Sequence, residues 1–180
     1  DSAPGISLFR TIAEQYPKAR IIAEDLGFIT DDVRELLEDT GFPGMKMLHF
    51  AFYDEDSEYL PRIYDTKNCV VYVSSHDSDC TRTWLKNLTG EAKRRFNKEC
   101  PRNKEQSRTA DLIEFAFRSI ANLAVVPMQD YLELTNEEGR MNTPSTLGKN
   151  WQFRTVNSDF SPALSLEIKR LNKLYNRLGE

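Results

Sequence analysis

Short apolar runs alternate with helical patterns along most of this sequence, and this order limits the folds open to it. The runs expected to form strands are residues 19–23, 44–50, 69–73 and 121–126. Helical patterns precede the first run, lie between Thr30 and Gly41, fill 79–120 in three pieces broken near Gly90 and Pro101, and return after Ser161. Strands that alternate with helices form a parallel sheet. The sequence therefore predicts an α/β fold with helices covering one face of that sheet.

The composition excludes several classes of partner. The 180 residues are 39% hydrophobic and 29% charged, enough for one domain with a core. A net charge of −4 argues against nucleic acid or an anionic membrane as the main partner. No apolar run approaches the roughly 20 residues that a membrane span needs. The first residue is Asp1 rather than Met, so we expect a processed chain or a part of something longer.

The cysteines indicate a reducing compartment. Cys69, Cys80 and Cys100 are odd in number, and no pair has C-x-x-C spacing. We therefore expect free thiols in a cytoplasmic protein, with neither a disulfide framework nor a zinc site.

Polar residues collect where the predicted strands end. The first strand runs into Glu24-Asp25, the second ends near His49, the third continues as Ser74-Ser75-His76-Asp77-Ser78-Asp79, and the fourth ends in Gln129-Asp130. In barrel and doubly wound folds, the loops after the carboxyl ends of the strands build the active site. We therefore expect these segments to converge on one mouth.

Period-2 alternation then assigns these side chains to faces. Ile22 and Glu24 share one face of their strand, and Val71, Val73, Ser75 and Asp77 are expected to share another. If Glu24 and Asp77 both point into the mouth, two carboxylates meet in a partly dry pocket, where burial and like charge raise the pKa of one. A carboxyl of that kind suits general acid/base chemistry on a glycosidic bond. Asp25, on the opposite face, is expected to tie down the following loop.

Each motif also has a simpler explanation. The pair Glu24-Asp25 could cap a loop or helix, Asp79 could be the N-cap of the following helix, and His49 could be a satisfied core histidine. His76-Asp77 could belong to a metal phosphohydrolase, which needs further ligands. Trp84 and Trp151 could be core aromatics rather than platforms for sugar rings.

Four blocks taken together carry a family resemblance. Residues 22–30 and 41–52 form the first two, 71–81 with Trp84 the third, and 127–130, 140–144 and 148–154 the last. In this order and spacing, from about residue 3 to 178, the sequence resembles the 4-α-glucanotransferases of the amylomaltase (disproportionating enzyme) family, glycoside hydrolase family 77.

The resemblance implies a TIM-type (β/α)₈ barrel, of which residues 1–180 would be the C-terminal part, about strands 5 to 8. It implies retaining transfer of an α-1,4-glucan segment from a maltooligosaccharide to the 4-hydroxyl of an acceptor, with no metal or organic cofactor. Glu24 would be the general acid/base and Asp77 the carboxylate that stabilises the transition state. His76, Asn142 and Asp25 would contact the substrate.

The same resemblance implies that part of the site is elsewhere. A retaining mechanism needs a nucleophilic carboxylate about 5–5.5 Å from the acid/base. In this family it lies on the strand before the one that carries Glu24, so the N-terminal half of the barrel and its nucleophile are expected outside this chain. Alone, the chain would be an inactive glucan-binding or assembly fragment, or a remnant, and its open sheet edges would favour self-association.

Two departures from the family pattern concern the site. The family usually has glutamine at the position of His49, and asparagine at the position of Ser78. The first changes a polar contact, and the second puts one side-chain hydrogen bond in doubt.

Overall fold

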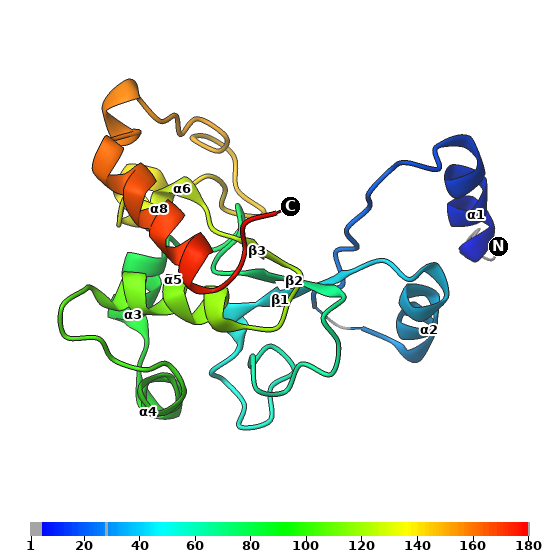
Figure 1. The fold of residues 1–180 in the computed structure, drawn as a ribbon, viewed down its shortest axis with the longest axis horizontal. Helices are drawn as coiled ribbons and strands as arrows, with labels where there is room; N and C mark the ends of the chain where they lie inside the picture. The colour runs from blue at the N-terminus through cyan, green and yellow to red at the C-terminus, as the bar shows by residue number, and fades with distance from the viewer. Residues whose placement is uncertain (1–4, 28, 180) are drawn as a thin grey trace.

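The computed structural model describes residues 5–27 and 29–179, in which short helices surround a small parallel sheet (Figure 1). Phe28, which belongs to the first family-like block, and residues 1–4 lie outside the described residues. In the described part the strands are β1 (Gly44–Met47), β2 (Cys69–Tyr72) and β3 (Leu123–Val125). The helices are α1 (Ile6–Gln15), α2 (Asp31–Thr40), η1 (Leu48–Phe50), α3 (Thr81–Asn87), α4 (Gly90–Glu99), α5 (Arg108–Arg118), α6 (Met128–Tyr131), α7 (Asn136–Gly139), η2 (Asn157–Asp159) and α8 (Pro162–Leu174).

The sheet has the order β1-β2-β3, and both strand pairs are parallel, as the alternation of strands and helices predicts. Met47 pairs with Tyr72, and Tyr72 pairs with Val125. Because paired residues in a parallel sheet point to the same face, these three side chains lie together on one face. Val71 and its partners Lys46 and Ala124 lie on the other.

The predicted first strand, residues 19–23, does not form. Within the described residues, a backbone hydrogen bond from the Ala23 N–H to the carbonyl of Pro43, at 3.0 Å, links it to the sheet region. A strand requires a ladder of such bonds, and apolar, β-branched residues such as Ile21 and Ile22 do not supply one without a partner strand. The segment is extended chain that leads from α1 towards Glu24.

The helices on one side of the sheet form the core. Val71 and Val73 are fully buried against residues of α3, α4 and α5, among them Trp84, Phe96 and Leu112. The predicted breaks hold: α3, α4 and α5 are separate, and α4 begins at Gly90 with a left-handed φ of 56°. The predicted start of the last helix is also confirmed, since Ser161 Oγ accepts a hydrogen bond from Leu164 N–H at 3.2 Å.

Helices α1 and α2 stand apart from this core at the other end of the molecule (Figure 1). Neither contains a buried residue, and Phe9 of α1 packs against Phe42, which follows α2, with ring centroids 5.4 Å apart. Gly41 ends α2 with a left-handed φ of 65°, as predicted. Thr30 occupies the predicted N-cap position, but its hydroxyl donates to the Asp32 carboxylate rather than accepting a backbone N–H.

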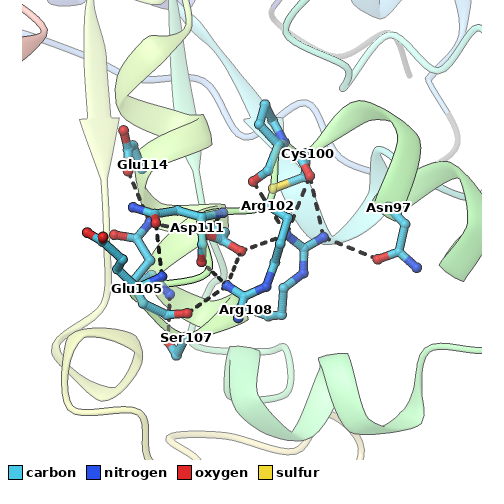
Figure 2. Close-up of polar contacts among 12 residues, drawn as sticks. Asn97, Cys100, Arg102, Glu105, Ser107, Arg108, Asp111 and Glu114 are labelled. Atoms are coloured by element: carbon cyan, nitrogen blue, oxygen red, sulfur yellow. Dashed lines mark hydrogen bonds and ion pairs between the residues drawn. The ribbon is translucent and has the colours of Figure 1, made fainter.

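A buried carboxylate orders the connection between α4 and α5 (Figure 2). The Asp111 carboxylate accepts hydrogen bonds from Arg108 at 2.7 Å, Arg102 at 3.0 Å and the backbone N–H of Asn103 at 3.1 Å. Arg108 also lies over the ring of Phe96, 4.2 Å from its centroid. These contacts bring charge partners to a side chain that is fully shielded from solvent.

Candidate active site

The sheet face away from the core is the floor of an open cleft of about 720 Å³. Met47, Tyr72 and Val125 line the cleft, in keeping with their shared register. At its carboxyl edge the lining continues with Glu24, from the extended segment, and with His76 and Asp77, from the turn after β2. The cleft therefore brings together three of the five residues predicted for the site. Glu24 and Asp77 are both exposed, so the described residues do not form the partly dry pocket expected from the sequence.

The charge of Glu24 affects the pKa of Tyr72 in the cleft floor. Burial raises the pKa of Tyr72, and the negative charge of Glu24 raises it further, because a second negative charge nearby disfavours the phenolate. Ile22 and Glu24, which were predicted to share a face, both line the cleft, although the segment that carries them is not a strand.

Val71 and Val73 share a face as predicted, but the prediction that Asp77 lies on the same face is wrong. Val71 and Val73 point into the helical core, and Tyr72 is the β2 side chain that faces the cleft. Asp77 reaches the cleft because the strand has already ended at Tyr72 and the chain turns before Asp77. Alternation fixes faces only within a strand, so it does not carry through a turn.

That turn is closed by Ser78. Its hydroxyl accepts the Ser75 N–H at 2.8 Å and donates to the Ser75 carbonyl at 3.0 Å. The Asp77 N–H is 3.3 Å from Ser75 Oγ. Ser78 thus makes local bonds that close the turn in which His76 and Asp77 are neighbours.

A loop from far along the chain completes this arrangement. The Asn142 amide donates to Asp77 Oδ1 at 2.6 Å, and the Asn142 N–H donates to the His76 carbonyl at 3.0 Å. His76 Nε2 lies 3.4 Å from the same Asp77 oxygen. The fourth predicted residue, Asn142, is therefore in contact with two of the others.

Arg140 fixes the base of this loop and was not predicted to do so. Its guanidinium contacts the Asp79 carboxylate and donates to the Asp77 carbonyl at 3.3 Å. Asn136 also donates to Asp79, at 2.8 Å. Asp79 therefore anchors the loop, and Cys80 rather than Asp79 is the N-cap residue of α3. The sequence places an arginine two residues before Asn142, but this position does not indicate that Asp79 is its partner.

Asp25, the fifth predicted residue, does not line this cleft. Its carboxylate accepts the Met45 N–H at 2.6 Å and packs against Gly44, where an added Cβ would clash with Asp25 Oδ2. It thus ties the segment after Glu24 to the first residues of β1. On its other side it borders a separate cleft of about 370 Å³ that Arg34 and Lys46 also line.

Two polar residues expected near the mouth are buried elsewhere. His49 is 2% exposed and stacks on Trp84, with ring centroids 4.4 Å apart, while its Nε2 lies 3.0 Å from Thr81 Oγ1. Asp130 is 1% exposed and accepts hydrogen bonds from Ser74 Oγ at 2.5 Å and Thr81 N–H at 2.7 Å. Both link α3 to the segments that follow the strands, because each forms a hydrogen bond with Thr81, the first residue of α3. The prediction that they face the mouth is wrong.

The comparison with known families decides the chain's affiliation. The sequence model of the glycoside hydrolase 77 family, described as 4-alpha-glucanotransferase, matches residues 1–158. The chain belongs to this family. It is 39% identical to the 4-alpha-glucanotransferase of Streptococcus pneumoniae over 178 residues, which are 98% of this chain and 35% of that protein. It is 40% identical to the chloroplastic/amyloplastic 4-alpha-glucanotransferase of Solanum tuberosum, covering 98% of this chain and 30% of that protein.

A solved glucanotransferase has the same fold over this region. Amylomaltase from Streptococcus agalactiae, solved in complex with acarbose, superposes with a TM-score of 0.90 at 35% identity. The match covers 98% of this chain and 36% of that one. The chain thus spans about a third of the length of the relatives it matches. Its α/β fragment with a three-stranded parallel sheet corresponds to part of the amylomaltase structure.

The structure places His49, the second histidine that a metal phosphohydrolase site could use, away from His76 and Asp77. A metal site around His76 and Asp77 needs His49 or further acids, and His49 is enclosed on Trp84 in the core. Across residues 5–27 and 29–179, no group of three or more His, Cys, Asp or Glu side chains lies close enough to hold a metal ion. In the same residues no helix has the length and apolar character needed to cross a membrane.

Proposed function

We propose that this chain is part of the catalytic barrel of a 4-α-glucanotransferase, which moves an α-1,4-glucan segment from a donor maltooligosaccharide to the 4-hydroxyl of an acceptor glucan or glucose. The observation that carries the proposal is the single cleft that Glu24, His76 and Asp77 line, with Asn142 bonded to Asp77. Membership of the family makes this chemistry the natural use of two carboxylates at the carboxyl end of a parallel sheet.

Each residue has a role that its position supports. Glu24 is the general acid that protonates the leaving oxygen, and then the base that takes a proton from the acceptor hydroxyl. Asp77 accepts hydrogen bonds from sugar hydroxyls, which strengthen as the ring flattens towards an oxocarbenium ion. His76 and Asn142 bind hydroxyls beside it. Asp25 acts on substrate through its hold on the start of β1, which shapes the cleft wall.

The nucleophile comes, in this proposal, from polypeptide outside these 180 residues. The described strands would be sixth to eighth in the barrel, with residues 19–23 in the place of the fifth. This assignment is supported by the open edges of the sheet, because β1 and β3 each pair on one side only within the described residues. A closed barrel pairs every strand on both sides. Residues 19–23 would then gain the partner strand they lack here.

Transfer rather than hydrolysis requires that acceptor sugar displaces water from the reacting carbon. The cleft formed by this chain is open, and its two carboxylates are exposed. The remaining barrel would close it and exclude water, which also strengthens the electrostatic interactions inside.

The test uses the full-length protein and measures glucose released during disproportionation of maltotriose. We expect Glu24→Gln to lower kcat by about 10²–10⁴-fold, because the amide holds no proton to transfer. Glu38→Gln, an exposed acid on α2, is the matched control and should keep wild-type rates. Wild-type transfer by the Glu24 variant would refute the assignment. Glucan binding without any transfer by the full-length protein would instead favour a non-catalytic binding role.

A further inference from the structure

Trp151 is a large exposed aromatic residue beside the candidate active site. It is 55% exposed, and its ring centroid lies 5.1 Å from that of His76, with 36° between the planes. The other tryptophan, Trp84, is 8% exposed and packs among core aromatics, so only Trp84 fits the core interpretation offered by the sequence. Tryptophan combines a large apolar face with a polar N–H, so an indole left open beside His76 is suited to contact with a ligand.

The backbone holds Trp151 in this position against its conformational preference. Its φ of 63° lies in the left-handed region, which is unfavourable for any residue with a bulky side chain. The Trp151 N–H donates to the Met141 carbonyl at 2.7 Å. The preceding residue, Asn150, accepts the Thr143 N–H at 3.0 Å and donates to the Thr146 carbonyl at 3.0 Å. Loop 141–151 is thus closed on itself, and the strain persists because these bonds over-determine it.

The same loop supplies two groups that contact the side chains of His76 and Asp77. Asn142 reaches the Asp77 carboxylate from one end of the loop, and Trp151 reaches the His76 ring from the other. A sugar ring whose hydroxyls form hydrogen bonds with Asp77 and His76 therefore has the indole at its side. The faces of glucose carry C–H bonds with partial positive charge, which pack well on the negative face of an aromatic ring.

Resting on the proposed function, we propose that Trp151 is a glucan-contact residue that extends the sugar-binding surface beyond His76. It binds a glucose unit next to the one held by His76 and Asp77, and it takes no part in proton transfer. Loss of the indole should therefore weaken binding of longer glucans while the chemical step is largely kept.

Tryptophan fluorescence tests this contact in the full-length protein. The difference between wild type and Trp151→Phe isolates the emission of Trp151 from that of every other tryptophan. We expect acrylamide to quench this difference signal strongly without ligand, because the indole is exposed, and maltoheptaose to reduce the quenching constant at least twofold. Maltotriose transfer kinetics give the second readout. Trp151→Ala should raise KM by about three- to tenfold, with kcat within about twofold of wild type.

Two variants separate a sugar contact from a general effect on the loop. Trp151→Phe keeps an aromatic face and should restore at least half of the lost affinity. Leu147→Ala removes a fully exposed side chain from the same loop and should change neither KM nor quenching. If the wild-type protein shows transfer but maltoheptaose leaves Trp151 fully accessible, the inference is overturned and the proposed function stays intact. The same holds if the wild-type protein shows transfer and KM is unchanged in Trp151→Ala. Absence of transfer by the wild-type protein, together with a Trp151 that maltoheptaose leaves fully accessible, would overturn both.

Discussion

The buried histidine makes the stability of this fold depend on pH. His49 is 2% exposed, and burial lowers its pKa from 6.5 to about 3 because the charged imidazolium would lose its hydration. Its Nδ1 has no hydrogen-bond partner among the described residues, so no acceptor stabilises a second ring proton. We therefore expect the folded protein to keep His49 neutral throughout the mildly acidic range.

The sign of the effect follows from linkage. At pH 7 both the folded and the unfolded chain hold His49 mostly neutral, and the residue contributes no pH dependence. Below pH 6.5 the unfolded chain binds a proton that the folded chain does not, so the free energy of unfolding falls. The slope is about 1.4 kcal/mol per pH unit between the two pKa values, which gives a loss of about 2 kcal/mol at pH 5 and about 4 kcal/mol at pH 3, where the folded state has begun to bind the proton as well.

His49→Gln isolates this term, because glutamine stays neutral and its amide is able to bond to Thr81 Oγ1. Urea unfolding, followed by far-UV circular dichroism, gives the free energy of unfolding of each protein. The value for wild type minus the value for the variant should fall by about 2 kcal/mol between pH 7 and pH 5. Asp130 also bonds to Thr81, and burial raises its pKa, which stabilises the fold as pH falls. That contribution is present in both proteins and cancels in the comparison.

His76→Gln is the matched control for the other histidine, whose side chain is half exposed. Measured alongside, it assigns to each histidine its share of the pH dependence. A wild-type minus His49→Gln difference that stays constant from pH 7 to pH 5 would refute the reasoning, since it would mean that the folded state protonates His49 as readily as the unfolded chain.

Two further predictions concern stability. Asp111→Asn should destabilise the fold by about 3 kcal/mol, measured as a lower urea midpoint, because it removes the buried charge that Arg102 and Arg108 neutralise; an unchanged midpoint would show that the arginines find equivalent partners. Gly44→Ala should destabilise by about 1–3 kcal/mol, because its Cβ would meet the Asp25 carboxylate. In Asp25→Ala that clash is gone, so the two substitutions should be non-additive by at least about 0.5 kcal/mol in thermal unfolding, and simple additivity would contradict the contact.

The sequence predicted the elements that local chemistry determines. Gly41 ends a helix because it adopts a left-handed φ, and Ser161 begins one because its hydroxyl caps a backbone N–H. The alternation of strands and helices predicted the parallel sheet, because a helix that connects two strands brings the second strand back to run parallel to the first. Residues 19–23 have strand-like chemistry but form no ladder, since pairing depends on a neighbour that the local sequence does not specify.

The site shows the same division between local and long-range causes. Strand ends converge at one edge of a parallel sheet by geometry, which is why Glu24, His76 and Asp77 could be placed together. Geometry does not say which residues turn inwards after the strand, so His49 and Asp130 were wrongly expected at the mouth. Their burial is set by Thr81, which lies 32 residues from His49 and 49 residues from Asp130 in the sequence.

Loop 141–151 is the part of the site that local reasoning reaches least. Arg140 finds Asp79 across 61 residues, and Asn142 finds Asp77 across 65. Neither pairing follows from spacing or propensity, yet together they decide where Trp151 stands. Because Asp79 holds the base of the loop through Arg140, loss of that pair would release the Asn142 amide from Asp77 and the indole from His76. The acid that resembled a helix cap is thus the residue through which the turn after β2 and the distant loop form one surface at the candidate active site.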